Sequence, residues 1–146
     1  MPTVKKFEDL EIWKLARLQA IAIYQLTILH PLAKDFEIVN QIRRSSGSVM
    51  DNIAEGFERF SNKEFSQHLI IAKGSNGEVR SQLYRAFDRH HISQDILEEN
   101  LKASEEIGNK LSAFIKYLNS STYKSKPTAT QQPQHPTSNI QPPTFL

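Results

Sequence analysis

Residues 36–60 read FEIVNQIRRSSGSVMDNIAEGFERF and carry apolar or small side chains at steps of three or four. This spacing places the side chains on one stripe of an α-helix, so the stretch predicts an amphipathic helix with that stripe in a hydrophobic core. Asp35 comes directly before the stretch and is expected to cap its first turn. The predicted core positions are Val39, Ile42, Ser46, Val49, Ile53, Phe57 and Phe60.

The preceding stretch, residues 9–30, is predicted to form a helix that is apolar along two adjoining stripes. The first stripe is Leu10, Trp13, Ile21, Tyr24 and Ile28, and the second is Ile12, Ala16, Ile23 and Leu26. Pro31 is expected to end this helix, because proline disfavours the α conformation in the residue before it. A single bundle would leave part of so apolar a surface exposed, so we expect the chain to form a homo-oligomer.

Two later stretches complete the fold prediction. Ser61 and Glu64 form a capping box for a helix over about 62–90, and Ser93 with Asp95 begins a fourth helix over about 94–119. Their inward positions are expected to be Phe65, Leu69, Ala72, Val79, Leu83 and Ala86, followed by Ile96, Leu97, Leu101, Ile107, Leu111, Phe114, Ile115 and Leu118. No stretch alternates with period two over a useful length, so the predicted fold class is all-α, an antiparallel up-and-down four-helix bundle over residues 1–120.

The last stretch, residues 121–146, has a different composition. It holds five of the seven prolines with Gln, Ser and Thr between them, and it contains no acidic residue. So few apolar side chains cannot offset the entropy of ordering, and we predict a disordered Pro-rich tail. The spacing of Pro133 and Pro136 is a weak polyproline signature of a protein partner. The net charge of the whole chain is only +2.

The sequence excludes several classes of function. There is no cysteine, so disulfides, thiolate zinc sites and a cysteine nucleophile are excluded. The chain has none of the Glu-x-x-His pairs of di-iron bundles, no Walker lysine motif and no nucleophile elbow. No apolar run approaches the roughly 18 residues of a membrane span, and no signal peptide is evident. We therefore predict a cytoplasmic protein that is not an enzyme, with no metal, no cofactor, no membrane contact and no evident small-molecule substrate.

Two segments break the local helix propensity. Ser45-Ser46-Gly47-Ser48 lies inside the second predicted helix, and Gly74-Ser75-Asn76-Gly77 lies inside the third. Each glycine in the middle of a helix costs about 1 kcal/mol relative to alanine. Two interpretations remain open: small side chains let two helix backbones approach closely, or they line a groove where a phosphate or another subunit meets the backbone.

A set of motifs runs through these predicted helices. The central ones are Gln41-Ile42-Arg43-Arg44-Ser45-Ser46, Ser48-Val49, Asn52-Ile53-Ala54-Glu55-Gly56, Arg59 and Ser61-x-Lys63-Glu64-Phe65. Around them stand Phe7-x-Asp9-Leu10-x-Ile12-Trp13-Lys14, Ile71-Ala72-Lys73-Gly74-Ser75-x-x-Glu78 and Gln82-Leu83. Over about residues 7–118 the chain resembles the 23S rRNA intervening-sequence protein family.

The resemblance implies a four-helix bundle that assembles as a ring-shaped homopentamer. It also implies distant kinship with the accessory proteins of diversity-generating retroelements, which bind nucleic acid. The family usually ends its third helix with a Leu-Gly-Tyr-like turn, whereas this chain has Arg89-His90-His91 there. The replacement puts a glycine C-cap in doubt and adds basic character.

Arg43 is predicted to lie beside the core, about 100° from Ile42 on the second helix. A buried charge without a partner costs several kcal/mol, so Arg43 needs a carboxylate or backbone carbonyls. We predict a structural ion pair with an acid of another helix or subunit, with Glu78 as the first choice.

Cations on the second and third helices are candidate nucleic-acid contacts. Lys73, Gly77, Arg80 and Tyr84 are spaced by four, three and four residues, so they line up along one helix edge. Cations neutralise phosphates and a tyrosine can stack on an unpaired base. Alternatively, this edge is a solvated flank with Tyr84 half buried against the fourth helix. The full candidate set is Arg44, Arg59, Lys63, Lys73, Arg80 and Tyr84.

We predict a non-catalytic, ring-like homo-oligomer, pentameric by resemblance, that binds nucleic acid, with RNA favoured over DNA. The alternative is a structural or adaptor oligomer that binds another protein, without nucleic-acid binding and with the Pro-rich tail as one recruiting element.

Overall fold

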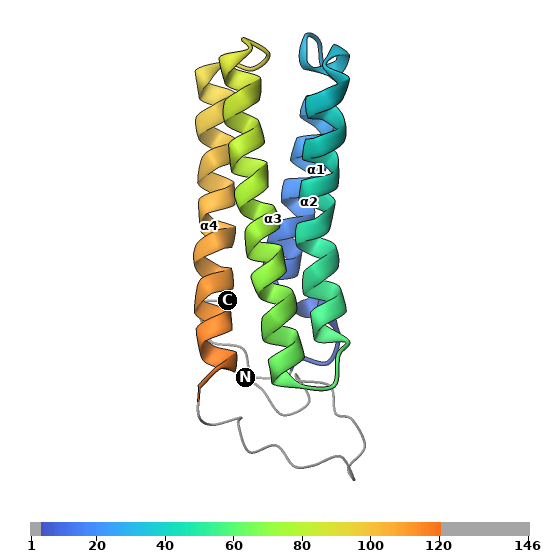
Figure 1. Cartoon of the computed structure of the whole chain (residues 1–146), viewed down its shortest axis with the longest axis vertical. Coiled ribbons are helices and arrows are strands. Elements are labelled where there is room, and N and C mark those ends of the chain that lie inside the picture. The colour runs from blue at the N-terminus through green and yellow to red at the C-terminus, as the bar shows by residue number, and fades with distance from the viewer. Residues whose placement is uncertain (1–3, 121–146) are drawn as a thin grey trace.

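The computed structural model describes residues 4–120. It contains four long helices. They are α1 (Glu11–Thr27), α2 (Phe36–Phe57), α3 (Asn62–Asp88) and α4 (Gln94–Leu118), with the short 3-10 helices η1 (Phe7–Asp9) and η2 (Leu32–Lys34). Successive long helices point in opposite directions, and α1 lies behind α2 and α3 (Figure 1). The predicted antiparallel up-and-down bundle is confirmed. The predicted tail, residues 121–146, lies outside the described residues.

The predicted caps begin three of these helices. The backbone amides of Ile38, Glu64 and Ile96 each donate to the preceding cap side chain, at 3.4 Å to Asp35, 3.1 Å to Ser61 and 3.2 Å to Ser93. The return half of the capping box differs from the prediction, because the Glu64 carboxylate meets the Ser61 hydroxyl, at 3.3 Å, rather than its backbone amide. Local side-chain chemistry therefore sets where these helices start.

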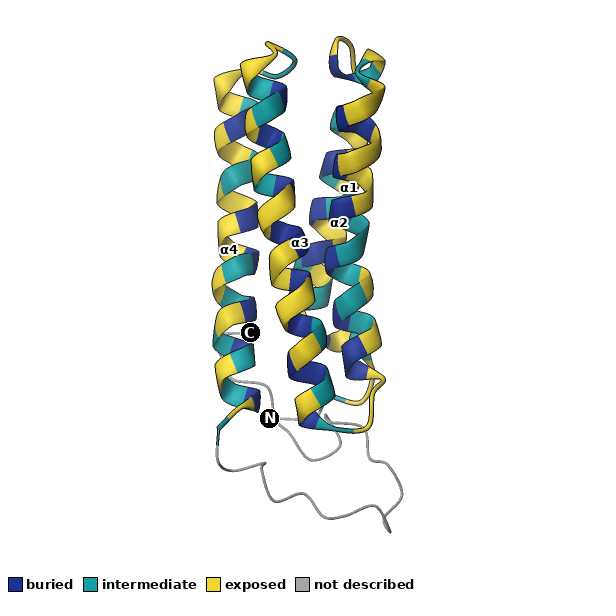
Figure 2. Cartoon of the chain, in the orientation of Figure 1, coloured by how far each residue is buried: buried dark blue, intermediate teal, exposed yellow. Residues whose placement is uncertain are grey.

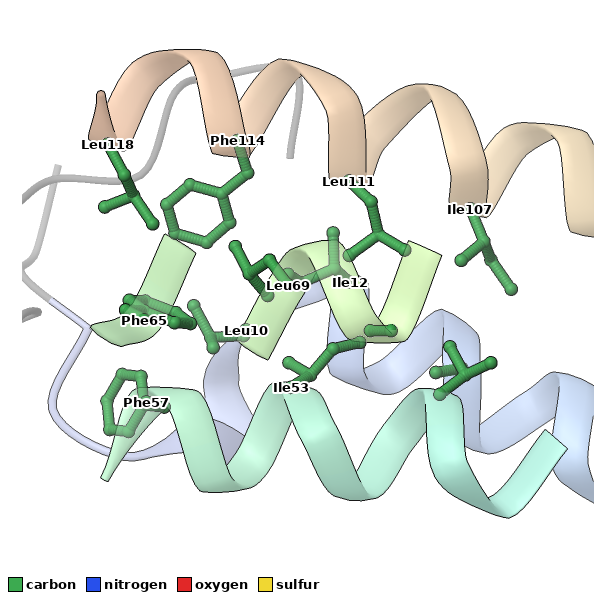
Figure 3. Packing of buried hydrophobic residues seen from close by; sticks show 13 residues of the cluster. Leu10, Ile12, Ile53, Phe57, Phe65, Leu69, Ile107, Leu111, Phe114 and Leu118 are labelled. Carbon is green, nitrogen blue, oxygen red and sulfur yellow. The ribbon is translucent and has the colours of Figure 1, made fainter. Parts of the chain in front are cut away.

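Aromatic side chains fill the core near the α2–α3 turn. The Phe57 and Phe65 rings meet edge to face with centroids 6.0 Å apart, and the Phe65 and Phe114 rings do so at 5.2 Å. Aliphatic side chains from all four helices surround them (Figure 3). All predicted inward positions of α3 are buried. The prediction for Phe60 is wrong: its side chain is 64% exposed, because α2 ends at Phe57.

The first helix buries its second apolar stripe, whereas its first stripe is buried at Leu10 and exposed from Ile21 onward. Ile12, Ala16 and Ile23 are buried, whereas Ile21, Tyr24 and Ile28 are 45%, 53% and 55% exposed. Buried residues face the interior of the bundle and exposed ones cover its outside (Figure 2). The outer face of α1, continued by the exposed Leu18 and Leu29, is therefore an apolar surface on the single chain.

The mid-helix glycines do not serve close packing within the chain. Apart from its own helix backbone and its chain neighbours, a Cβ atom added at Gly47, Gly74 or Gly77 would have no heavy atom of residues 4–120 within 4 Å. The first of the two interpretations, close approach of two backbones, is therefore wrong for these glycines within one chain. Close approach occurs instead at Gly56, where an added Cβ would lie 2.7 Å from the Cβ of His68.

Polar side chains tie three helices together inside the bundle. Asn76 of α3 donates to the backbone carbonyl of Ser104 on α4 at 2.9 Å and accepts from the Ser104 hydroxyl at 2.9 Å. The amide of Gln19 on α1 donates to the same Asn76 oxygen at 3.2 Å. These bonds satisfy buried polar groups and fix the register of α3 against its neighbours.

The turn that follows α3 contains His90, which has a φ of 62°. The amide of His91 donates to the carbonyl of Ala86 at 2.9 Å, and the amide of His90 donates to that of Phe87 at 2.9 Å. These two bonds form a Schellman motif, in which the left-handed residue is usually glycine. In this chain the turn keeps the Schellman geometry, and His90 takes the left-handed position, which is strained for a residue with a side chain.

Among residues 4–120, none of the helices combines the length and apolar character that crossing a membrane requires.

Candidate nucleic-acid interface

Two neighbouring residues of α3 contact different helices. The Ser75 hydroxyl lies 2.8 Å from that of Ser48 on α2, whereas Asn76 bonds to Ser104 on α4. Residues three or four positions apart lie on the same side of a helix. Lys73 precedes Asn76 by three positions and Arg80 follows it by four, so both lie on the side of α3 that faces α4. The outer surface of α3 therefore has an α2 flank and an α4 flank.

The predicted stripe lies on the α4 flank of α3. Lys73 is exposed, Arg80 is partly exposed, and Tyr84 is 47% exposed. Within residues 4–120 neither cation has an ion-pair partner. Gly77 lies within the stripe and Gly74 lies beside it, so the helix backbone is uncovered there. The stripe thus presents two uncompensated positive charges and an aromatic ring beside accessible backbone.

Arg44 does not join this stripe. It belongs to α2 and lies beside the α2 flank of α3. It lines a groove of about 680 Å³ between α2 and α3. Arg85 also lines the groove, and its guanidinium donates to the side-chain oxygen of Gln41 on α2. Arg85 was missing from the predicted set. The sequence did contain a signal for it: Arg85 follows Glu78 by seven residues, which places both residues on one side of α3.

Arg59 and Lys63 lie at the α2–α3 turn, apart from both flanks. Arg59 is paired with Glu55 at 2.9 Å and lies 3.8 Å from Glu64. The hydrogen bond to Arg59 holds the pKa of Glu55 below its ordinary value of 4.5, and the same bond raises the pKa of Arg59. The charge of Arg59 is thus compensated by neighbouring carboxylates, and Lys63 is exposed.

The predicted pair of Arg43 and Glu78 does not form within the described chain. Arg43 is exposed, its Nε donates to the Thr27 hydroxyl at 2.8 Å, and its guanidinium lies 4.6 Å from the centre of the Tyr24 ring. This side of α2 faces α1, whereas Glu78 lies in the groove on the side that faces α3. Arg43 satisfies its charge through a cation–π contact and solvent rather than through a carboxylate.

Comparison with known proteins gives the family. Residues 8–113 match the profile of the family described as 23S rRNA-intervening sequence protein. The chain belongs to this family. It is also similar to the crystal structure of a protein with unknown function from the S23 ribosomal protein family of Bacteroides thetaiotaomicron, with 26% sequence identity, a TM-score of 0.67, and coverage of 72% of this chain and 98% of that one. A comparison with curated proteins finds no match.

This member of the 23S rRNA-intervening sequence protein family uses its Asn-Ile-Ala-Glu-Gly motif for packing of α2 against α3. The Asn52 amide donates to the Ser48 carbonyl at 2.9 Å, and its oxygen lies 3.2 Å from Nδ1 of His68. Nε2 of His68 lies 3.5 Å from the Glu55 carboxylate, and Gly56 makes room for His68. Local geometry thus accounts for the motif through the contact of α2 with α3.

The Arg89-His90-His91 turn of this family member meets the start of α2. Asp35 accepts from Arg89 at 2.9 Å and lies 2.9 Å from Nε2 of His91, while Glu37 pairs with Arg89 at 3.1 Å. The hydrogen bond from Arg89 is the largest cause that holds the pKa of Asp35 below its ordinary value of 3.8. The basic turn therefore clamps one end of the bundle. Within the described residues, no three His, Asp or Glu side chains are grouped as metal ligands.

Proposed function

We propose that the chain is a non-catalytic nucleic-acid-binding protein that works as a homo-oligomer and prefers RNA. The observation that carries the proposal is the stripe of Lys73, Arg80 and Tyr84 on the α4 flank of α3. Its two cations have no acidic partner in the part of the chain described. Phosphates would meet these cations, and an unpaired base would stack on the half-exposed tyrosine ring.

The two uncovered glycines support the same proposal. Gly74 and Gly77 leave the backbone of α3 open along the stripe, at a cost to helix stability that no contact among the described residues offsets. A sugar–phosphate backbone could approach the helix more closely there than at a residue with a side chain. Of the two interpretations of these glycines, the groove or contact surface is the one that the geometry favours.

The outer face of α1 supports assembly into an oligomer. Ile21, Tyr24 and Ile28 are about half exposed and lie on one side of α1, where they line a mainly apolar pocket of about 560 Å³. Both α1 and α3 pack chiefly against α2 and α4, so they occupy opposite corners of the bundle. A second copy could cover α1 while α3 stays free to bind RNA.

The family resemblance suggests a ring of five copies. On such a ring the two unpaired cations of each stripe become about ten, and phosphate contacts add in the salt dependence of binding. Repetition around a ring would give useful affinity to a chain whose net charge is only +2.

A titration of labelled single-stranded RNA tests the nucleic-acid part of the proposal. The wild type, the double variant Lys73→Gln/Arg80→Gln, and the control Lys102→Gln/Lys116→Gln are compared at several salt concentrations. The control removes two positive charges from exposed positions on α4. We expect the stripe variant to bind at least about tenfold more weakly at low salt, with a salt slope smaller by about 1.4 per chain engaged, and the control to stay close to wild type.

Equal losses in the two variants would contradict a specific role of the stripe. Absence of RNA and DNA binding by the wild type at low salt would overturn the nucleic-acid proposal and favour the adaptor function.

Light scattering tests the oligomer separately. We expect the wild type to have a mass of several chains, and Ile21→Glu to shift the mass to that of a monomer, because it places a charge in the apolar face of α1. The control Gln67→Glu adds the same charge at an exposed position of α3 and should leave the mass unchanged. A monomeric wild type would overturn this part of the proposal.

A further inference from the structure

The groove between α2 and α3 brings together six polar motif residues that the stripe does not use. Each helix contributes four of its lining residues. Six of the eight belong to the motifs on which the family resemblance rests: Gln41, Arg44, Ser45, Ser48, Glu78 and Gln82. Residues far apart in the sequence thus converge on one feature of the surface.

The middle of the groove is open because three of its eight lining positions carry serine. Ser45 and Ser48 of α2 face Ser81 of α3 across it, where larger residues would fill the space. The hydroxyl of Ser48 is held by that of Ser75 at 2.8 Å, and the hydroxyl of Ser45 donates to the carbonyl of Gln41 at 2.9 Å. The floor of the groove is therefore fixed before any ligand arrives.

Two guanidinium groups give the groove an anionic preference. Arg44 has no ion-pair partner in the described part of the chain, and Arg85 contacts only the neutral Gln41 side chain. A phosphate accepts parallel hydrogen bonds from a guanidinium in a fixed fork geometry, which makes arginine well suited to it. Both side chains line the same groove, so a phosphate bound there would meet guanidinium groups from α2 and from α3.

The groove also contains hydrogen-bond acceptors, next to the two arginine donors. Glu78 is the one acid among the eight lining residues of the described chain, and it has no ion-pair partner there. Within residues 4–120, the buried side-chain oxygen of Gln82 has no hydrogen-bond partner. Carboxylate oxygens accept hydrogen bonds, so a ligand that engages Glu78 as well as the arginines carries N–H or O–H donors together with an anion.

We infer that the groove binds one unpaired guanine nucleotide, with its phosphate on Arg44 and Arg85 and its base on Glu78. Guanine presents two adjacent N–H donors on its Watson–Crick edge, which match the two oxygens of a carboxylate. Uracil presents one such donor, and adenine and cytosine present a single amino group, so they pair less well with Glu78. Unstacked bases are commonly recognised through this edge in single-stranded RNA. The inference rests on the proposed function and names the nucleotide that the protein selects.

The test titrates the full chain with each of the four nucleoside monophosphates and, separately, with inorganic phosphate, followed by isothermal calorimetry or amide chemical shifts. We expect guanosine monophosphate to bind at least about fivefold more tightly than the other three, with shifts confined to residues that line the groove. Glu78→Gln should abolish this preference and leave phosphate binding intact. Arg85→Gln should weaken all four nucleotides alike.

Two control proteins separate this inference from the proposed function. Glu105→Gln removes an exposed carboxylate from α4 and should keep the guanine preference, and the stripe variant Lys73→Gln/Arg80→Gln should also keep it. Loss of RNA binding in the stripe variant with intact guanine binding would support both proposals. Equal binding of the four nucleotides, binding of inorganic phosphate alone, or a preference that survives Glu78→Gln would overturn the guanine site, even if the protein binds RNA.

Discussion

The α2–α3 contact has two halves that differ in what their small residues do. In the half near the turn, Gly56 lets Phe65 and His68 of α3 press against the α2 backbone. In the other half, Ser45 and Ser81 leave a groove open to solvent. The same family motifs contribute to both halves. Small residues in a helix motif therefore indicate close packing only where a neighbouring side chain fills the space they leave, and otherwise they mark accessible surface.

The largest expected effect is that of Gly56→Ala. An added Cβ would lie 2.7 Å from the Cβ of His68 and 3.2 Å from the carbonyl oxygen of Phe65, so the helices must separate. We expect the free energy of unfolding to fall by about 2–4 kcal/mol, measured by denaturant titration. A loss of less than about 0.5 kcal/mol would show that this half of the contact is not tightly packed.

The clamp between the Arg89-His90-His91 turn and Asp35 should be sensitive to acid. The pKa of Asp35 is lowered in the folded chain, so its contribution to stability is present above its unfolded pKa near 3.8 and is lost as pH falls through the lower folded value. Asp35→Ala also removes the cap of α2, and we expect it to destabilise the chain by about 1–2 kcal/mol at pH 7.

Unfolding of wild type and Asp35→Ala at pH 7 and at pH below 3 measures this difference. We expect the gap between the two proteins to shrink at low pH. A gap that stays constant would contradict the role of the ionised carboxylate.

The smallest expected effect is that of Gly74→Ala, which should raise the free energy of unfolding, whereas Gly56→Ala should lower it. Gly74→Ala adds a Cβ where no atom lies within 4 Å, so we expect it to stabilise the chain by about 0.5–1 kcal/mol through helix propensity. If the open backbone of α3 meets RNA, the same substitution should weaken RNA binding. A destabilised Gly74→Ala protein would mean that a partner copy already packs there.

Local chemistry explains why the helices could be predicted from the sequence. Asp35, Ser61 and Ser93 cap the helices that follow them, and a cap needs only residues within one turn. Phe60 shows the limit of periodicity, because it continues the apolar spacing beyond the point where α2 ends. A stripe shows which face is apolar, but it does not show where the helix stops.

The candidate site could be predicted only in part, because it depends on which helices are neighbours. The positions of Lys73 and Arg80 on one edge of α3 follow from spacing alone. Whether Arg43 faces α1 or α3 depends on the arrangement of the bundle, and spacing does not provide this. Arg85 belongs to the candidate site only because α2 and α3 are neighbours, which brings its guanidinium to Gln41.

The most direct test of the RNA-binding surface is photocrosslinking of single-stranded RNA that carries 4-thiouridine to the full chain, followed by mass spectrometry of the linked peptides. The account predicts that crosslinks concentrate on residues 73–84 of α3, with Tyr84 the main attachment point, and that they disappear at high salt. Crosslinks that fall instead on α4 or on the exposed face of α1, with none on α3, would contradict it.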